Sequence, residues 1–242
     1  MKAFRLSGLL SRPHIFCWAL LLVTSVAKGG DMEDLIWAAS QDHHRAVEQL
    51  LSEGMDVNSA DQLGNTLLIL ATREQNTQTV KLLLRADADV NVRNRNGDTA
   101  LGWATLKDNV ELVRLLLEAG ARLNHSGWTP LMYAAYRSLP SLMQLYLRAG
   151  ADPNLSNEGG TTALMVASLR GCVICAKTLL NHGALVDKQN ATGETALDIA
   201  RMKQHDKIAR LLTQPEQSLL PTLSIPNDVP IRRNPGSSAV RP

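Results

Sequence analysis

The chain has 242 residues, 45% of them hydrophobic, with 25 basic and 23 acidic side chains. This near balance excludes a protein that binds nucleic acid through a strong overall positive charge, and three cysteines are too few for a scaffold built from disulfide bonds. Aromatic residues make up only 4% of the chain. A core must therefore be filled mainly by Leu, Ala, Val and Ile, which favours closely packed helices.

Residues 1–27 have the pattern of a secretory signal peptide. Lys2, Arg5 and Arg12 form a basic start, and an apolar run from Ile15 to Ala27 ends in small side chains. This run is shorter than the roughly 20 residues of a transmembrane helix. We therefore predict cleavage after Ala27 and Sec-type export to the periplasm, without stable membrane insertion. Secretion from the cell and tethering by an uncleaved N-terminal anchor are the alternatives.

The centre of the chain repeats at a fixed period. One series of glycines has spacings of 33, 30, 33 and 33 and consists of Gly64, Gly97, Gly127, Gly160 and Gly193. A second series shares the three-residue deletion and consists of Gly54, Asp87, Gly120, Gly150 and Gly183. Because two independent series carry the same deletion, the period reflects a structural repeat.

Each repeat is predicted to contain a short helix, a turn and a longer helix. A threonine stands where its hydroxyl can cap the first helix, at Thr66, Thr99, Thr129, Thr162 and Thr195. A Leu and an Ala three residues apart follow it and are expected on one buried face. The glycines of the second series fit the left-handed residue that closes a helix, and Asp87 predicts a weaker helix end in the second repeat.

The recurring G-x-T-[PA]-L-x-x-A and the L-L-x-x-G-A-D-x-N ending resemble the ankyrin-repeat family. The resemblance implies an all-α solenoid, a stack of about six ankyrin repeats with polar end caps, in a domain that spans residues 28–213. The predicted units are 31–62, 63–95, 96–125, 126–158, 159–190 and 191–213. Residues 214–242 contain six prolines without a helical period and are predicted to be a disordered tail.

Motifs for chemistry are scarce, so no catalytic residue, metal site, cofactor, small-molecule substrate or nucleic-acid partner is predicted. Cys172 and Cys175 form a C-x-x-C after Gly171 at the start of a predicted helix. A helix N-terminus lowers the pKa of a thiol, which would suit a local disulfide or thiol exchange in an exported protein. The favoured interpretation is that Cys175 packs in the core as an inert thiol, since C-x-x-C outside a βαβ unit is weak evidence for redox work.

The resemblance places partner binding on the concave face, made by the hairpin fingers and the first helix of each repeat. The residues selected on that face are Trp103, Lys107, Trp128, Tyr133, Tyr136, Arg137 and Arg170. Tyr and Trp beside Arg are typical of binding hot spots. For Trp103 and Tyr133 a half-buried structural role is an equal alternative, and the basic side chains could equally line a solvated helix edge.

The three-residue deletion shortens one finger to Asn124-His125-Ser126, beside Trp128. A short finger next to a Trp predicts a notch in the concave face. We therefore expect an exported, monomeric, non-enzymatic module that binds a folded partner protein. A redox accessory protein that acts through Cys172 and Cys175 is the alternative, and an effector delivered to a host cell is a weaker one.

Overall fold

The computed structural model describes residues 32–213. The predicted signal peptide, residues 1–27, and the predicted tail, residues 214–242, lie outside this range. The described residues form twelve α-helices and no strand, which confirms the all-α solenoid. The helices are α2 (Met32–Ser40), α3 (His44–Ser52), α4 (Leu67–Arg73), α5 (Thr77–Arg85), α6 (Ala100–Leu106), α7 (Val110–Glu118), α8 (Pro130–Tyr136), α9 (Pro140–Arg148), α10 (Ala163–Arg170), α11 (Val173–Asn181), α12 (Ala196–Met202) and α13 (Asp206–Thr213).

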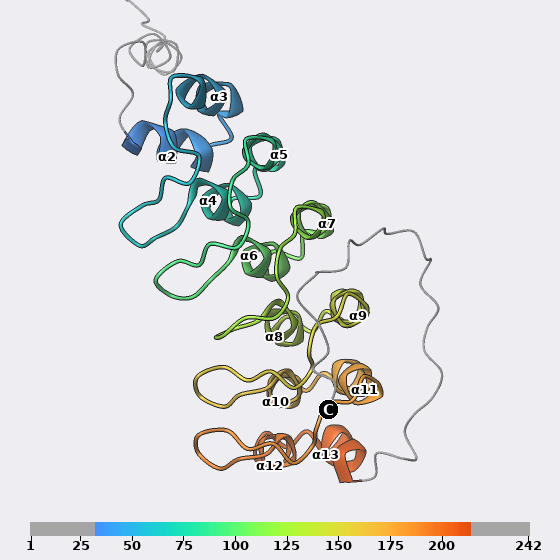
Figure 1. Ribbon diagram of the computed structural model, residues 1–242. Coiled ribbons are helices and arrows are strands. Elements are labelled where there is room, and N and C mark those ends of the chain that lie inside the picture. Colours follow the sequence, from blue (N-terminus) through green and yellow to red (C-terminus); the bar gives the residue numbers. More distant parts are fainter. Residues whose placement is uncertain (1–31, 214–242) are drawn as a thin grey trace, which may run out of the picture.

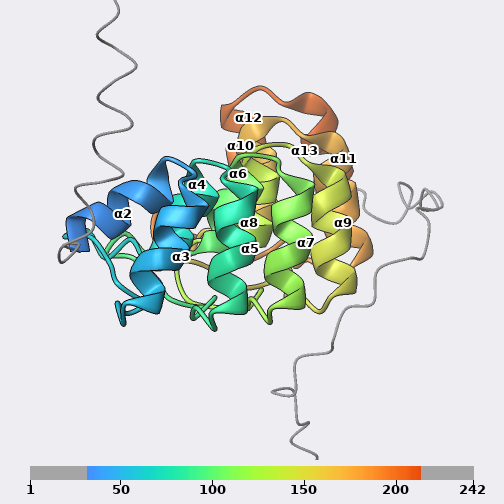
Figure 2. The same ribbon diagram turned by 90° about the horizontal axis from the view of Figure 1, so that it is seen from above.

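The helices stack in two layers, with long loops projecting from one of them (Figure 1). The inner helices are the first of each pair, namely α2, α4, α6, α8, α10 and α12. The outer helices are the second of each pair, and α3, α5, α7 and α9 lie side by side in Figure 2. Each loop that leads from an outer helix to the next inner helix is here called a finger.

The inner helices meet through the Leu and Ala positions that the repeat predicted. Leu68, Leu101, Leu131 and Leu164 are buried, and the Ala three residues after each is fully buried. Because an alanine has only a methyl group, neighbouring inner helices approach closely at these positions. Tyr146 on α9 is the largest fully buried side chain among residues 32–213, and its hydroxyl lies 2.6 Å from Thr105 Oγ1.

The predicted threonine caps are confirmed at all five inner helices from α4 to α12. The hydroxyl oxygen of each threonine accepts a hydrogen bond from the backbone N–H three residues later, at 3.0–3.4 Å. Each bond satisfies one of the free N–H groups at the start of a helix and stabilises that helix by about 1 kcal/mol. These caps fix where each inner helix begins relative to its finger.

The outer helices end in the left-handed conformation that the second glycine series predicted. Gly120, for example, has a φ of 88° after α7, and Asp87 adopts a φ of 59° at the equivalent position after α5. A side chain in this conformation costs roughly 1 kcal/mol relative to glycine. The helix therefore ends at Asp87 with the same geometry as in the other repeats, at a higher local energy.

None of the helices between residues 32 and 213 has the length and apolar character of a transmembrane span.

Candidate partner-binding surface

Three of the selected side chains, from α8, α10 and the finger before α8, form a cluster that is here called the aromatic patch: Trp128, Tyr136 and Arg170. The Trp128 and Tyr136 rings lie 6.0 Å apart, edge to face, and Arg170 Cζ lies 4.8 Å from the centre of the Tyr136 ring. Tyr136 is 40% exposed and Arg170 is exposed. An exposed aromatic ring with a stacked guanidinium presents a large, rigid contact area, as binding hot spots do.

Tyr133 lies on the same helix as Tyr136, but its side chain is buried. It is only 9% exposed, and its hydroxyl donates a hydrogen bond of 2.6 Å to Asp98 Oδ1. Its ring packs over Gly102, where an added Cβ would come within 2.9 Å of it. Burial and the neighbouring Asp98 carboxylate raise the pKa of Tyr133 far above its usual value. Tyr133 therefore joins α8 to the preceding repeat and supports Trp128, whose ring centre is 5.3 Å away.

Trp103 lies one repeat earlier, on α6. It is half-buried, and Arg73 Cζ is 6.0 Å from its ring centre. Its indole N–H is buried and has no acceptor among the described residues. Trp103 thus repeats the aromatic and arginine pairing of the patch at the neighbouring inner helix.

The selected basic residues stand where the inner helices end. Lys107 and Arg137 are the C-caps of α6 and α8, and Arg170 is the last residue of α10; all three are exposed. Between residues 32 and 213 the ion pairs are Arg73–Glu74 and Lys81–Glu111, so none of these three cations has a carboxylate partner there. Their positive charges face solvent along one edge of the inner layer.

Cys172 and Cys175 are joined by a disulfide bond at the start of α11. Cys175 is fully buried, as the core position predicted, while Cys172 is half-buried and is the N-cap of the helix. The favoured interpretation had left the thiols unpaired, whereas the structure pairs them. The disulfide lies at the turn between α10 and α11, where the chain passes from the inner to the outer layer.

The fingers differ in length, which explains the interruption in the repeat. Four fingers, 53–66, 86–99, 149–162 and 182–195, are equally long, and the finger 119–129 before α8 is shorter than these by the deletion (Figure 1). In each long finger an Asp or Asn side chain accepts two backbone N–H groups and closes the turn; Asn94 does so for Asn96 and Asp98. The short finger lacks this residue, because the deletion follows Asn124. Asn124 itself bonds Gly150 O and Asp152 N in the next repeat, as Asn91 and Asn154 do from the long fingers.

Long fingers that are neighbours are also joined by backbone hydrogen bonds. Arg95 N donates to Leu63 O at 2.9 Å, and Ala191 N donates to Gly159 O at 2.8 Å. The equivalent donors beside the short finger, the backbone N–H groups of His125 and Glu158, make no such bond within residues 32–213. The row of fingers is therefore interrupted on both sides of residues 119–129.

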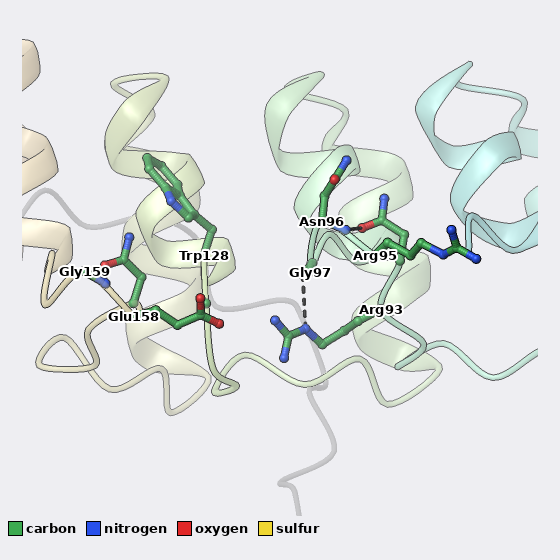
Figure 3. A pocket seen from close by; sticks show the side chains of 10 residues that line it. Arg93, Arg95, Asn96, Gly97, Trp128, Glu158 and Gly159 are labelled. Carbon is green, nitrogen blue, oxygen red and sulfur yellow. Dashed lines mark hydrogen bonds between the residues drawn. The ribbon is translucent and has the colours of Figure 1, made fainter. Parts of the chain in front are cut away.

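A cavity of about 520 Å³ occupies this interruption, and we call it the notch (Figure 3). Residues 93–97 form one wall, Asn157, Glu158 and Gly159 form the other, and Gly127 and Trp128 lie between them. The notch was predicted from the spacing of the glycines, but its walls were not. Sequence analysis missed Arg93 and Glu158, because the only sign of this site in the sequence was the three-residue deletion, which does not show which side chains lie around it.

Comparisons with known proteins agree with the architecture. A family model described as ankyrin repeats in three copies matches residues 20–94, 76–145 and 131–220. No curated protein matches the chain.

Among solved structures, an ankyrin repeat domain (ABAYE2397) from Acinetobacter baumannii AYE is 30% identical, with a TM-score of 0.66, over 76% of this chain and 97% of that one. A second similar chain comes from the structure of the Bd0816 predatory endopeptidase from Bdellovibrio bacteriovorus in complex with the immunity protein Bd3460. It is 28% identical, with a TM-score of 0.66, and the match covers 75% of this chain and 97% of that one. The human ASB11 ankyrin repeat domain is 28% identical, with a TM-score of 0.65, and the match covers 75% of this chain and 83% of that domain. With its period, its helix pairs and its threonine caps, the chain belongs to the ankyrin-repeat family.

Proposed function

We propose that this chain is an exported, non-enzymatic protein that binds a folded partner protein with its inner helices and fingers. Ankyrin repeats are modules of protein–protein interaction. The observation that carries the proposal is the aromatic patch: Tyr136 is exposed, and both Trp128 and Arg170 pack against its ring. A rigid aromatic side chain loses little conformational entropy when a partner covers it, so it contributes strongly to affinity.

The partner is proposed to be another exported protein, since the pattern of residues 1–27 predicts passage through the Sec route. An enzyme is the class of partner that we favour. The support is the likeness to a chain from the complex between the Bd0816 endopeptidase and its immunity protein. In this proposal the stack restrains the enzyme by covering its surface, which requires no chemistry from the ankyrin repeats.

The test is capture of the partner by the full-length chain, tagged at its C-terminus and expressed in its source organism. Tyr136→Ala with Arg170→Ala removes the exposed part of the aromatic patch, and we expect at least about a tenfold loss of captured partner. Ile174→Ala with Arg148→Ala is the matched control, because it removes an exposed apolar side chain and an exposed arginine from outer helices α11 and α9. This control should capture as much partner as the unchanged protein.

Equal capture by the patch variant and the unchanged protein would contradict binding through the patch. Fractionation of the same cells tests export: the chain and its partner should both be found in the periplasmic fraction. Recovery of the full-length chain from the cytoplasm alone would contradict the proposed location.

A redox role is the second candidate, and the Cys172–Cys175 disulfide is the observation that favours it. Cys172 is partly accessible at the N-terminus of α11, where the helix dipole stabilises a thiolate. A Cys175→Ser variant tests it. Unchanged oxidant resistance in cells that carry this variant would rule out the redox role and leave the disulfide as a structural link.

A further inference from the structure

We infer that the notch is a receptor for an acidic loop of the partner protein, whose carboxylate pairs with Arg93. The inference rests on the proposed function and specifies the chemistry of the partner at one place. Arg93, Trp128 and Glu158 are the side chains that decide it, and Figure 3 shows all three around the notch.

The Arg93 guanidinium is held in place before any partner arrives. Its Nε donates to Gly97 O at 3.1 Å, and one terminal nitrogen, Nη1, donates to Ser126 Oγ at 2.6 Å. The other terminal nitrogen, Nη2, has no acceptor among the described residues. It lies so close to Gly97 and Gly127 that an added Cβ at either glycine would come within 2.6 or 2.8 Å of it. The Arg93 side chain thus extends from its own finger to the short finger, where the three deleted residues would otherwise lie.

This arrangement leaves a fixed positive charge without a counter-ion. No carboxylate of residues 32–213 forms an ion pair with the Arg93 guanidinium, and the side chain is exposed. A guanidinium binds a carboxylate in preference to water when its position is fixed, because little side-chain entropy remains to be lost. The unused Nη2 donor points to an acceptor supplied from outside the chain.

Glu158 on the opposite wall is the one acidic side chain among the described residues that line the notch. It is exposed, and its carboxylate makes no hydrogen bond to any described residue, so it is solvated and can turn away from an arriving anion. For an incoming carboxylate, the attraction of the fixed Arg93 guanidinium is therefore stronger than the repulsion of the solvated Glu158 carboxylate. Arg95 adds a second exposed cation on the same wall as Arg93.

Trp128 connects the notch with the aromatic patch, since it lines the cavity and also contacts Tyr136. A partner that covers the patch therefore also lies next to the notch, where it can place a loop. The basic side chains at Lys107, Arg137 and Arg170 lie along the same layer and give an acidic partner surface a favourable field.

The test uses the full chain labelled with 15N and two cyclic peptides as probes. The first probe, cyclo(Gly-Asp-Glu-Gly-Ser-Pro), carries two carboxylates, and the second replaces them with Asn and Gln. We expect the dicarboxylate probe to shift the amide signals of residues 93–97, 126–128 and 157–159. The diamide probe should leave these signals in place. Equal shifts with both probes, or shifts confined to other residues, would overturn the inference.

Three variants sharpen the test. Arg93→Gln should weaken binding of the dicarboxylate probe about tenfold, and Glu158→Gln should tighten it about two- to threefold, because it removes the opposing charge. Insertion of Val-Arg-Asn after Asn124 restores a finger of full length while Arg93 stays, and it should abolish binding by filling the notch. Binding that survives this insertion, or that is unchanged in Arg93→Gln, would overturn the inference.

The outcome is distinguishable from that of the proposed function. If the aromatic patch variant loses the captured partner while Arg93→Gln retains both partner and probe, the notch inference fails and the proposed function stands. If the probe binds as expected but no variant of the patch affects capture, the notch is a carboxylate site and the proposed function fails.

Discussion

Tyr133 and Tyr136 stand three residues apart on α8, and the helix divides them between the interior and the surface. Tyr133 is 9% exposed and bonded to Asp98, whereas Tyr136 is 40% exposed and stacks with Arg170. Sequence reasoning selected both as binding candidates, with a half-buried structural role as an equal alternative for Tyr133 alone. The structure decides between the two for Tyr133, because its ring packs against Gly102, a residue without a side chain.

A Tyr133→Phe substitution should therefore lower the free energy of unfolding by about 1–2 kcal/mol and leave partner capture unchanged. It removes a half-buried hydrogen bond to a carboxylate, and Asp98 loses a donor that water replaces only in part. Urea denaturation of the full chain measures the loss. Tyr136→Phe is the control, with an expected change below about 0.5 kcal/mol. Equal stabilities of the two variants would show that the Tyr133 hydroxyl contributes nothing to the fold.

At the scale of one helix, α11 is the element with a covalent link to the turn before it. The Cys172–Cys175 disulfide closes a very short loop, and Cys172 Sγ also accepts a hydrogen bond from Cys175 N at 3.2 Å. Sequence reasoning placed Cys175 in the core correctly. It favoured an inert thiol over the disulfide that the structure shows, since both satisfy the same apolar position and the same spacing.

Reduction of this disulfide should lower the free energy of unfolding by about 2 kcal/mol, because so short a loop restricts the unfolded chain only modestly. Urea denaturation with and without dithiothreitol measures the difference. A Cys172→Ser, Cys175→Ala variant should be insensitive to the reductant. If the unchanged protein is equally insensitive, the two sulfurs are not joined in solution.

At the scale of the whole molecule, the constant period of the sequence predicts most of the architecture, because each repeat contacts only its neighbours. The helix pairs, the threonine caps and the buried Leu and Ala positions all follow from that period. The walls of the notch do not, since Arg93 and Glu158 lie at finger positions that differ from repeat to repeat. They line one cavity only because the finger between them is short. A deletion in a periodic sequence predicts where the stack of repeats is interrupted. The side chains around the deletion decide what the resulting notch can bind.

The same deletion divides the row of fingers into two groups, which predicts a difference in hydrogen exchange across the molecule. The backbone N–H groups of Arg95 and Ala191 are bonded to neighbouring fingers, while those of His125 and Glu158 have no such acceptor among the described residues. The amides of His125 and Glu158 should therefore exchange at least about fivefold faster than those of Arg95 and Ala191, after correction for intrinsic rates, in native-state exchange followed by NMR. Insertion of Val-Arg-Asn after Asn124 supplies the absent turn residue and should slow both amides to the level of the other fingers. Fast exchange that persists in this variant would mean that the helices on either side of the short finger are too far apart for a continuous row of hydrogen bonds between fingers. Helix packing, and not the length of the finger, would then cause the interruption.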